Sequence, residues 1–246
     1  MDFKEIKLLK DNYKTVDYPG IGVITYKRNI KARRLSISVK NSSTVKVTIP
    51  NTLSFRSAES FVLSKSKWIV EKVQYFSNMK VKFNESELFK TREHTLNFIS
   101  INTVQVLVKI ESENINVFYP SSIDVSSNLV QEAARKGIEL AYRLEAKKYL
   151  PARVELLAKQ FGYKYSKVGI KKASTRWGSC SPTNNINLSL FLMKLPDELI
   201  DYIILHELCH TVHKNHGAKF WDELDRLTLG NAKKLSKEVK KYRANI

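Results

Sequence analysis

The sequence predicts an α+β protein whose two halves are organised differently. Short runs that alternate apolar and polar residues, rich in β-branched side chains, recur through the first half and are typical of half-buried strands. The second half contains a long helical pattern over 127–161 and a strongly apolar helix that begins at Pro196. A polar break after residue 120 separates them. We therefore expect a mainly antiparallel β module with one long helix at 1–120, followed by a second, largely helical domain at 121–246.

The elements of the first half follow from the spacing of their apolar residues. Residues 1–19 show no firm pattern and are expected to form a loose lead-in. Leu35–Val39 and Val45–Ile49 alternate and are separated by a polar turn, which predicts a hairpin with one buried face. Ser54 is typical of an N-cap, and an apolar stripe predicts one helix from there to about Phe76. Further strands are expected at 21–26, 95–101, 104–110 and 115–119.

The long helix of the second half is expected to run from Ser127 to about Phe161. Pro151 lies inside it and has to kink or restart the helix, and Gly162 is suited to end it. Pro196, followed by two acidic residues, is typical of a helix start. Strands are expected at 168–172 and 186–192, and further helices at 218–227 and after Gly230.

Composition excludes several classes of protein. The chain has 246 residues, of which 43% are hydrophobic and 27% charged, as is normal for a soluble globular protein. No apolar run approaches the ~20 residues of a membrane span, and the charged N-terminal stretch lacks a signal-peptide pattern. Two cysteines are too few for a disulfide framework, so we expect reduced thiols and a cytoplasmic protein. Cys180 and Cys209 are expected to be small buried apolar residues rather than metal ligands.

The chain is strongly basic. Its formal net charge is +18 and its pI is about 9.8, which favours acidic partners such as nucleic acid or polyanionic substrates. The basic residues are spread along the sequence, with the densest segments at 27–34 and 233–243. No zinc-finger, helix-turn-helix or RNA-recognition signature accompanies the charge. Nucleic acid is therefore a possible partner without a recognisable binding motif.

His206, Glu207 and His210 spell the motif H-E-x-x-H. Residues four apart on a helix lie one turn apart on the same face, so the two imidazoles can bind one metal ion. Glu207 lies one residue round the helix, where it can act on a metal-bound water. The helix is apolar before and inside the motif, and buried imidazoles and carboxylates need partners, which a metal supplies. The remote His94 is instead expected to be an exposed residue at a strand edge.

A catalytic zinc needs a third protein ligand, and two histidines compete for that role. His213 continues the same face of the helix, but it lies about 10 Å along the axis from His206, too far for three ligands of one ion. His216 can reach the metal only if the helix stops and the chain turns back. Asn215 and Gly217 suit such a stop because they tolerate the left-handed backbone that ends many helices. We therefore expect His206, His210 and His216 to be the ligands.

Three segments together resemble the YgjP-like metallopeptidase family, which is related to SprT-like and WLM peptidases and, more distantly, to gluzincins. The first is Ser-Thr-Arg-Trp-Gly-Ser-Cys-Ser at 174–181, and the second is Asn-Ile-Asn-Leu at 185–188. The third runs from Leu199 through the H-E-x-x-H motif to Trp221. The N-terminal half also resembles that of the family. The resemblance covers about 26–242, so the two halves are expected to form one family-wide unit.

The resemblance implies a zincin-like (minigluzincin) core in which a helix lies beside an edge strand. It implies one zinc ion per chain on His206, His210 and His216, with Glu207 as the general base. The implied reaction is hydrolysis of peptide or protein substrates by a zinc-activated water. It further implies that the segment 176–181 forms the edge strand and runs along the active-site cleft. The substrate-binding residues expected on this segment are Arg176, Trp177, Gly178 and Ser179.

Three other interpretations stay open. A zinc-activated water also attacks phosphoryl groups, so the protein could be a phosphohydrolase or nucleotide hydrolase. By analogy with the SprT-like relatives, it could be a DNA-associated protease. The zinc could also be structural, closed by a fourth ligand such as Glu223 or Asp222. In the peptidase, the candidates for stabilising the oxyanion besides zinc are His213, Arg176 and Tyr202.

Overall fold

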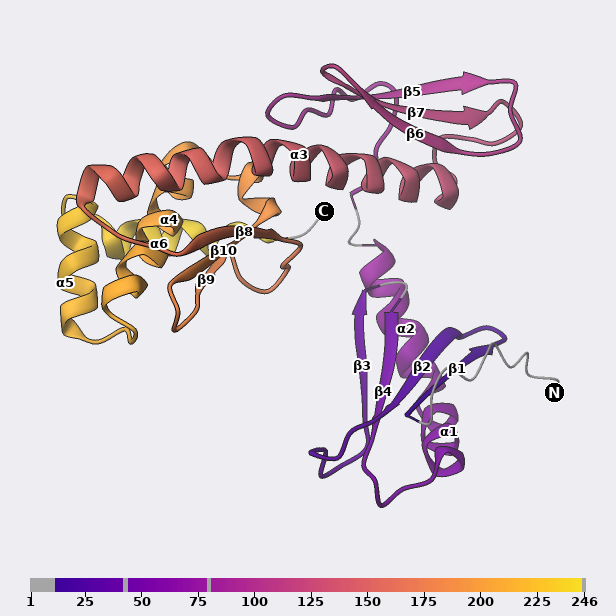
Figure 1. The fold of residues 1–246 in the computed structure, drawn as a ribbon. Helices are drawn as coiled ribbons and strands as arrows, with labels where there is room; N and C mark the ends of the chain where they lie inside the picture. Colours follow the sequence, from indigo (N-terminus) through magenta and orange to yellow (C-terminus); the bar gives the residue numbers. More distant parts are fainter. Residues whose placement is uncertain (1–11, 42–43, 79–80, 245–246) are drawn as a thin grey trace. The chain divides into compact units, whose positions relative to one another are not determined.

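The structure is a computed structural model that describes residues 12–41, 44–78 and 81–244. Two compact units divide the chain, Met1–Val81 and Lys82–Ile246. Each contains both helices and sheets, so the expected α+β class is confirmed (Figure 1). The units meet in the sequence at Val81, whereas the polar break had suggested residue 120.

A four-stranded sheet forms the framework of the N-terminal unit, in the order β1-β2-β4-β3. Its strands are β1 (Tyr13–Tyr18), β2 (Gly22–Arg28), β3 (Ser36–Asn41) and β4 (Thr44–Ile49). β3 and β4 form the expected antiparallel hairpin, and β2 pairs with β4 in parallel. Strand β1 corrects the expectation of a loose lead-in for 13–18, while residues 1–11 of that stretch lie outside the described residues. It buries only Val16 and Tyr18, too short an alternation to recognise, and it is fixed by antiparallel pairing with β2.

Two helices cover this sheet where one was expected. They are α1 (Phe55–Ser64) and α2 (Ser66–Asn78). Ser54 caps α1 as expected, since its hydroxyl accepts the backbone N–H of Ser57 at 3.0 Å. The helix ends at Ser64, whose hydroxyl donates to the carbonyl of Phe61 at 2.8 Å, a local bond that competes with the helical ladder. The apolar stripe continues across the break, so the spacing of apolar residues did not reveal it.

A long helix, α3 (Asn128–Phe161), organises the C-terminal unit. A left-handed Gly162 ends the helix as expected, Ser127 is its N-cap, and the helix continues through Pro151 without restarting. One part of α3 packs on a sheet of order β5-β7-β6, and the remainder packs on the elements around the H-E-x-x-H helix (Figure 1). The strands are β5 (Thr95–Ile101), β6 (Leu107–Glu111) and β7 (Asn114–Pro120). Helix and sheet approach so closely that a Cβ on Gly137 would lie 2.5 Å from Cγ2 of Ile115.

The contacts of α3 explain why the unit begins before residue 120. The Gln131 side chain accepts the backbone N–H of Phe83 at 2.9 Å and donates to its carbonyl at 2.7 Å. His94, expected to be exposed, is instead buried, and its Nδ1 lies 2.7 Å from Oε1 of Glu145 on α3. The segment before β5 and the sheet itself are therefore anchored to α3. This tertiary packing assigns residues 82–120 to the C-terminal unit.

A second three-stranded sheet of this unit has the order β8-β10-β9. Its strands are β8 (Lys167–Lys171), β9 (Gly178–Cys180) and β10 (Asn185–Ser189). The strand expected at 186–192 ends earlier, because the Ser189 hydroxyl accepts the N–H of Phe191 and starts a 3₁₀ turn. That turn and the remaining helices are η1 (Leu190–Lys194), α4 (Asp197–Val212), α5 (Ala218–Leu227) and α6 (Ala232–Val239). β10 lies between the other two strands, which leaves β9 at an edge of the sheet.

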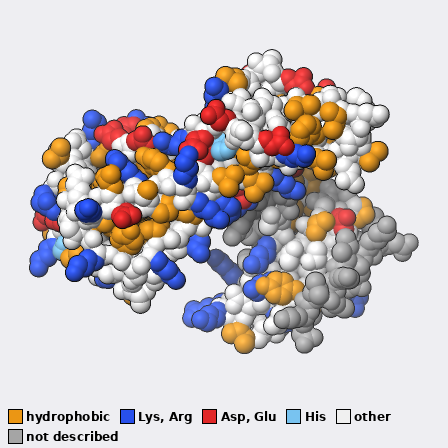
Figure 2. Space-filling view, turned by 45° about the horizontal axis from the view of Figure 1, so that its top comes forward, with side chains coloured by type: hydrophobic (Ala, Val, Ile, Leu, Met, Phe, Trp, Pro, Cys, Tyr) orange, Lys and Arg blue, Asp and Glu red, His pale blue; other side chains and the backbone are white. Residues whose placement is uncertain are grey.

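Charged side chains are dispersed on the visible face of the C-terminal unit (Figure 2). On the face shown in Figure 2, Lys and Arg side chains are scattered among acidic and hydrophobic ones over the C-terminal unit. None of the described helices combines the length and the apolar character that a membrane crossing requires.

Candidate metal centre

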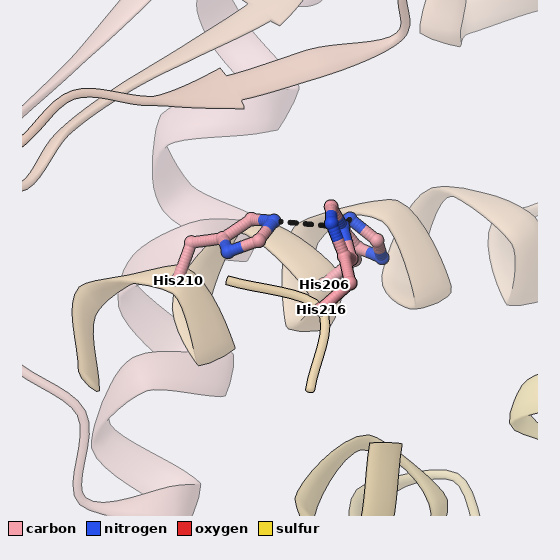
Figure 3. Close-up of side chains that lie close together, drawn as sticks. All are labelled: His206, His210 and His216. Atoms are coloured by element: carbon pink, nitrogen blue, oxygen red, sulfur yellow. Dashed lines mark hydrogen bonds between the residues drawn. The ribbon is translucent and has the colours of Figure 1, made fainter. Parts of the chain in front are cut away.

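Helix α4 presents two histidines of the H-E-x-x-H motif from a largely buried helix. Pro196 is its N-cap, and Asp197 and Glu198 lie in its first turn, where acids favour the positive end of the helix dipole. His206 and His210 follow one turn apart near its C-terminal end, and their ring centroids are 4.9 Å apart (Figure 3). The helix therefore holds two imidazoles at one place on its surface.

The third imidazole comes from the segment after the helix. The Nε2 atom of His216 lies 3.1 Å from Nε2 of His206 and 3.1 Å from Nε2 of His210 (Figure 3). Tetrahedral zinc–nitrogen bonds of about 2.0–2.1 Å would place ligand atoms about 3.3 Å apart, close to these separations. Among the described residues, these three form the one group of His, Cys, Asp and Glu with ligand spacing. The three donors fit a zinc ion that keeps an open coordination position.

The chain reversal that brings in His216 differs from the expected one. Helix α4 ends at Val212, three residues before Asn215, and its C-cap His213 has an extended backbone (φ −105°, ψ 97°). No residue from 213 to 217 adopts a positive φ, and Gly217 has φ −76°. The left-handed stop near Asn215 was therefore wrong. An extended turn at His213 ends the helix and leaves room for His216 to face the pair.

His213 takes part in the site through its backbone. Nδ1 of His210 lies 2.9 Å from the carbonyl oxygen of His213. Since a carbonyl can only accept, Nδ1 carries the proton and the lone pair of His210 is on Nε2, which faces the other imidazoles. The side chain of His213 is not in the cluster. The residue excluded as a ligand thus orients one of the expected ligands, His210.

Burial keeps the helix histidines in the neutral form that a metal requires. Desolvation, together with the neighbouring His210 and His216, lowers the pKa of His206 to about 4. Burial also lowers the pKa of His210. Phe220 on α5 supplies apolar surroundings for all three rings, with centroid distances of 4.9, 4.6 and 4.7 Å to His206, His210 and His216. The contact of Phe220 with the three imidazoles was not predicted from the sequence, where Phe220 was only one residue of the segment from Leu199 to Trp221.

Glu207 lies on the side of α4 that faces strand β9. Its side chain is only 5% exposed, and burial raises its pKa to about 7, although the charge of Arg176 acts in the opposite direction. Its Oε2 atom is buried without a hydrogen-bond partner among the described residues. A buried carboxylate with a free oxygen and a pKa near neutrality is suited to exchange protons with a bound molecule.

Strand β9 approaches Glu207 through Gly178. A Cβ atom at this position would lie 2.6 Å from Oε1 and 2.8 Å from Cδ of Glu207, so only glycine fits beside the carboxylate. β9 pairs with β10 on one side only, with Leu188 opposite Gly178, and is the edge strand that the resemblance implied. A residue expected to contact substrate therefore also determines where the carboxylate lies.

The other expected substrate-binding residues lie on or next to β9. Arg176 is exposed, Trp177 packs partly against the core, and Ser179 pairs with Asn187 in the sheet. The carbonyl of Trp177 accepts the N–H of Ser189 at 2.8 Å, which ties the segment to the sheet just before β9. The structure thus brings these residues together along one edge beside the histidine cluster.

The two thiols and the acids of α5 take no part in the cluster. Cys209 is buried, and burial raises its pKa to about 11, so its thiolate form is disfavoured. Cys180 is half-buried, and burial raises its pKa as well. Glu223, suggested as a closing ligand, instead accepts bonds from Tyr163 and Arg226. Asp222 is also outside the group of ligand-spaced residues.

The chain is similar to known proteins in sequence. A sequence model described as "YgjP-like, metallopeptidase domain" matches residues 33–242. The metallopeptidase zymogen jannalysin of Methanocaldococcus jannaschii is 28% identical over 37% of this chain and 92% of its own, with a TM-score of 0.33. The zymogen abylysin of Pyrococcus abyssi is 25% identical over 37% of this chain and 91% of its own, also with a TM-score of 0.33. No curated protein matched the chain.

Replacing Gly178 with Ala should misplace the Glu207 carboxylate while leaving the histidines intact. The added methyl group cannot fit at 2.6 Å from Oε1, so either the strand or the carboxylate has to move. We expect hydrolytic activity to fall about 100-fold with an unchanged zinc content. Gly217→Ala is the control, since no heavy atom lies within 4 Å of a Cβ there and its φ is ordinary. Equal activities of the two variants would contradict this account of Gly178.

Metal analysis of two histidine variants tests the ligand assignment. His216→Ala removes one of three converging donors and should lose zinc, because two ligands hold the ion weakly. His213→Ala should largely keep zinc, since the carbonyl that orients His210 remains. Zinc loss in the second variant alone would show that the imidazole of His213 is a ligand and would refute the assignment.

Proposed function

The chain belongs to the YgjP-like metallopeptidase family, and we propose from this premise that it hydrolyses peptide bonds with one zinc ion held by His206, His210 and His216. The observation that carries the proposal is the convergence of three Nε2 atoms beside the buried carboxylate of Glu207. When bound, zinc would polarise the scissile carbonyl and lower the pKa of water at the site. The proposed substrates are peptides or unfolded protein segments.

Glu207 is the proposed general base. Its Oε2 atom has no partner among the described residues and can accept the proton of the attacking water. A pKa of about 7 lets the same group release this proton near neutral pH, and the leaving amine is the natural acceptor. Gly178 keeps the carboxylate pressed between α4 and β9, so its position relative to an added peptide is fixed.

The outer edge of β9 is the proposed peptide-binding surface. An edge strand offers unpaired backbone N–H and C=O groups to an extended chain, which can join the sheet as an additional strand. The bound peptide would then run past the metal centre alongside Arg176, Trp177, Gly178 and Ser179. Of the candidates for oxyanion stabilisation, Tyr202 is buried and bonded to the Ser236 side chain. Arg176 and His213 therefore remain the candidates for stabilising the oxyanion.

Replacing Glu207 with Gln should separate catalysis from metal binding. The amide cannot accept a proton, so we expect peptide hydrolysis to fall by about 10²–10⁴-fold while zinc content stays at one ion per chain. Glu223→Gln is the matched control, because this acid is bonded to Arg226 and Tyr163 rather than to the metal centre. Undiminished cleavage by Glu207→Gln would rule out the mechanism, and zinc loss in Glu223→Gln would favour a closed structural site.

A DNA-associated protease is the second candidate, favoured by the distribution of charge. Met1–Val81 holds 16 Lys and Arg residues but six Asp and Glu residues. Lys82–Ile246 holds 26 Lys and Arg residues and 18 Asp and Glu residues. The smaller unit thus carries more than half of the net charge of +18. Peptidase activity stimulated by DNA and lost steeply with added salt would support this candidate, and salt-insensitive activity would count against it. Parallel assays with nucleoside triphosphates would detect the alternative phosphohydrolase activity.

A further inference from the structure

A cavity of about 290 Å³ lies at the end of the proposed peptide-binding surface. Two segments that are far apart in the sequence line it. One precedes β9 and contributes Ser174, Thr175, Arg176 and Trp177, and the other follows α6 and contributes Tyr242 and Arg243. The cavity is thus continuous with the segment expected to bind substrate.

The two arginines of the cavity differ from the other arginines of the C-terminal unit. Five of the seven form ion pairs with carboxylates, such as Arg92 with Asp197 and Arg153 with Asp201. Within the described part of the chain, Arg176 and Arg243 are the two that lack an acidic partner within 4.0 Å, and both are exposed. The two arginines of this unit that have no acidic partner among the described residues therefore border the same cavity.

The rest of the lining suits a small anion. Ser174, Thr175 and Tyr242 contribute hydroxyl groups that can donate hydrogen bonds, and no acidic residue is part of the lining. Arginine binds carboxylates in a planar, two-pronged geometry, and bonds to a charged acceptor are stronger than those to a neutral one. A carboxylate is therefore the peptide group that complements this cavity best.

The position of the cavity indicates which part of a substrate reaches it. Gly178, at the start of β9, lies against Glu207. Arg176 comes before Gly178 in the sequence and lines the cavity. The cavity therefore lies beyond the N-terminal end of β9, on the side away from Glu207. Antiparallel strand pairs outnumber parallel ones two- to threefold. In a peptide paired antiparallel to β9, the C-terminal part of the peptide lies beside the N-terminal end of β9. The residues after the scissile bond would thus approach Arg176 and Arg243.

We propose that this cavity is a carboxylate-binding subsite, so that preferred substrates carry a carboxylate a few residues after the scissile bond. The carboxylate can come from an Asp or Glu side chain or from the C-terminus of the peptide. The inference rests on the proposed peptidase function, because it assigns a substrate class to the same cleft.

The test uses a set of quenched fluorescent peptides with one common core. At each of the four positions after the cleaved bond, Glu is compared with Gln and Lys, and every peptide is made with a free and with an amidated C-terminus. We expect kcat/KM to be about fivefold higher for peptides with a carboxylate in reach, as one exposed charge pair allows. The Glu substitutions test a side-chain carboxylate, and amidation tests the C-terminal carboxylate, so the two sources of the carboxylate are distinguished. Equal values for Glu, Gln and Lys, together with no effect of amidation, would overturn the proposal.

Variants of Arg243 connect the preference to the cavity. Arg243→Met should reduce the ratio of Glu to Gln peptides, and Arg243→Glu should shift the preference toward Lys peptides, a gain that misfolding cannot produce. Lys240→Met is the control, since it removes an exposed cation of the same C-terminal segment that does not line the cavity. An unchanged ratio in both Arg243 variants would also refute the proposal.

Binding measurements keep this test independent of catalysis. The same peptides are titrated into Glu207→Gln and into its combination with Arg243→Met, and their affinities are compared by calorimetry. Tighter binding of carboxylate peptides that is lost with Arg243→Met supports the subsite, even if the wild type cleaves none of them and the proposed function fails. Equal affinities would show that the cavity binds no carboxylate. If inorganic phosphate displaces the peptides far better than acetate does, the cavity belongs to another anion. Either result would overturn the proposal.

Discussion

The close approach of strand β9 to helix α4 at Gly178 is the contact on which the rest of the site depends. The space that a side chain would occupy there is filled by the carboxylate of Glu207. Because the carboxylate is enclosed in this way, its pKa rises to about 7 and one of its oxygens stays without a partner among the described residues. The same contact places an exposed sheet edge directly beside a proton acceptor. The proposed binding surface and the proposed base are therefore positioned by one packing interaction.

The metal centre depends in turn on how α4 ends. The extended backbone of His213 ends the helix, directs the following segment back toward it, and offers a carbonyl to Nδ1 of His210. One residue therefore controls the arrival of His216 and the tautomer of His210. Phe220, at the start of the next helix, completes the enclosure by contacting all three imidazoles. The apolar surroundings favour neutral rings, which is the state that binds a metal.

Around this centre, the C-terminal unit is assembled on α3, which packs on the β5-β7-β6 sheet as well as on the elements that carry the site. The residues that adjoin the proposed cleft come from distant parts of the chain, as Arg176 and Arg243 illustrate. The N-terminal unit has its own core and a larger share of positive charge than its size would give. In the proposed peptidase, substrate choice would depend on the subsite at Arg176 and Arg243, and the basic N-terminal unit would favour acidic partners.

The sequence by itself determined the elements whose signals are local. The periodicity of 127–161 and the terminating Gly162 predicted α3, and the histidine spacing in an apolar helix predicted that one face of α4 gathers two imidazoles. It also indicated His216 as the third ligand, because a straight helix cannot bring His213 to the same ion. These inferences needed only distances along the chain and the geometry of a helix.

Tertiary structure alone decided the features that depend on contacts between distant residues. β1 exists because β2 pairs with it, His94 is buried because Glu145 lies opposite, and the units divide at Val81 because Gln131 binds Phe83. The helix end at Val212 and the fit of Gly178 against Glu207 likewise have no signature in local spacing. Each of these is fixed by packing and hydrogen bonding between segments, whose free energy becomes available only once the chain has folded.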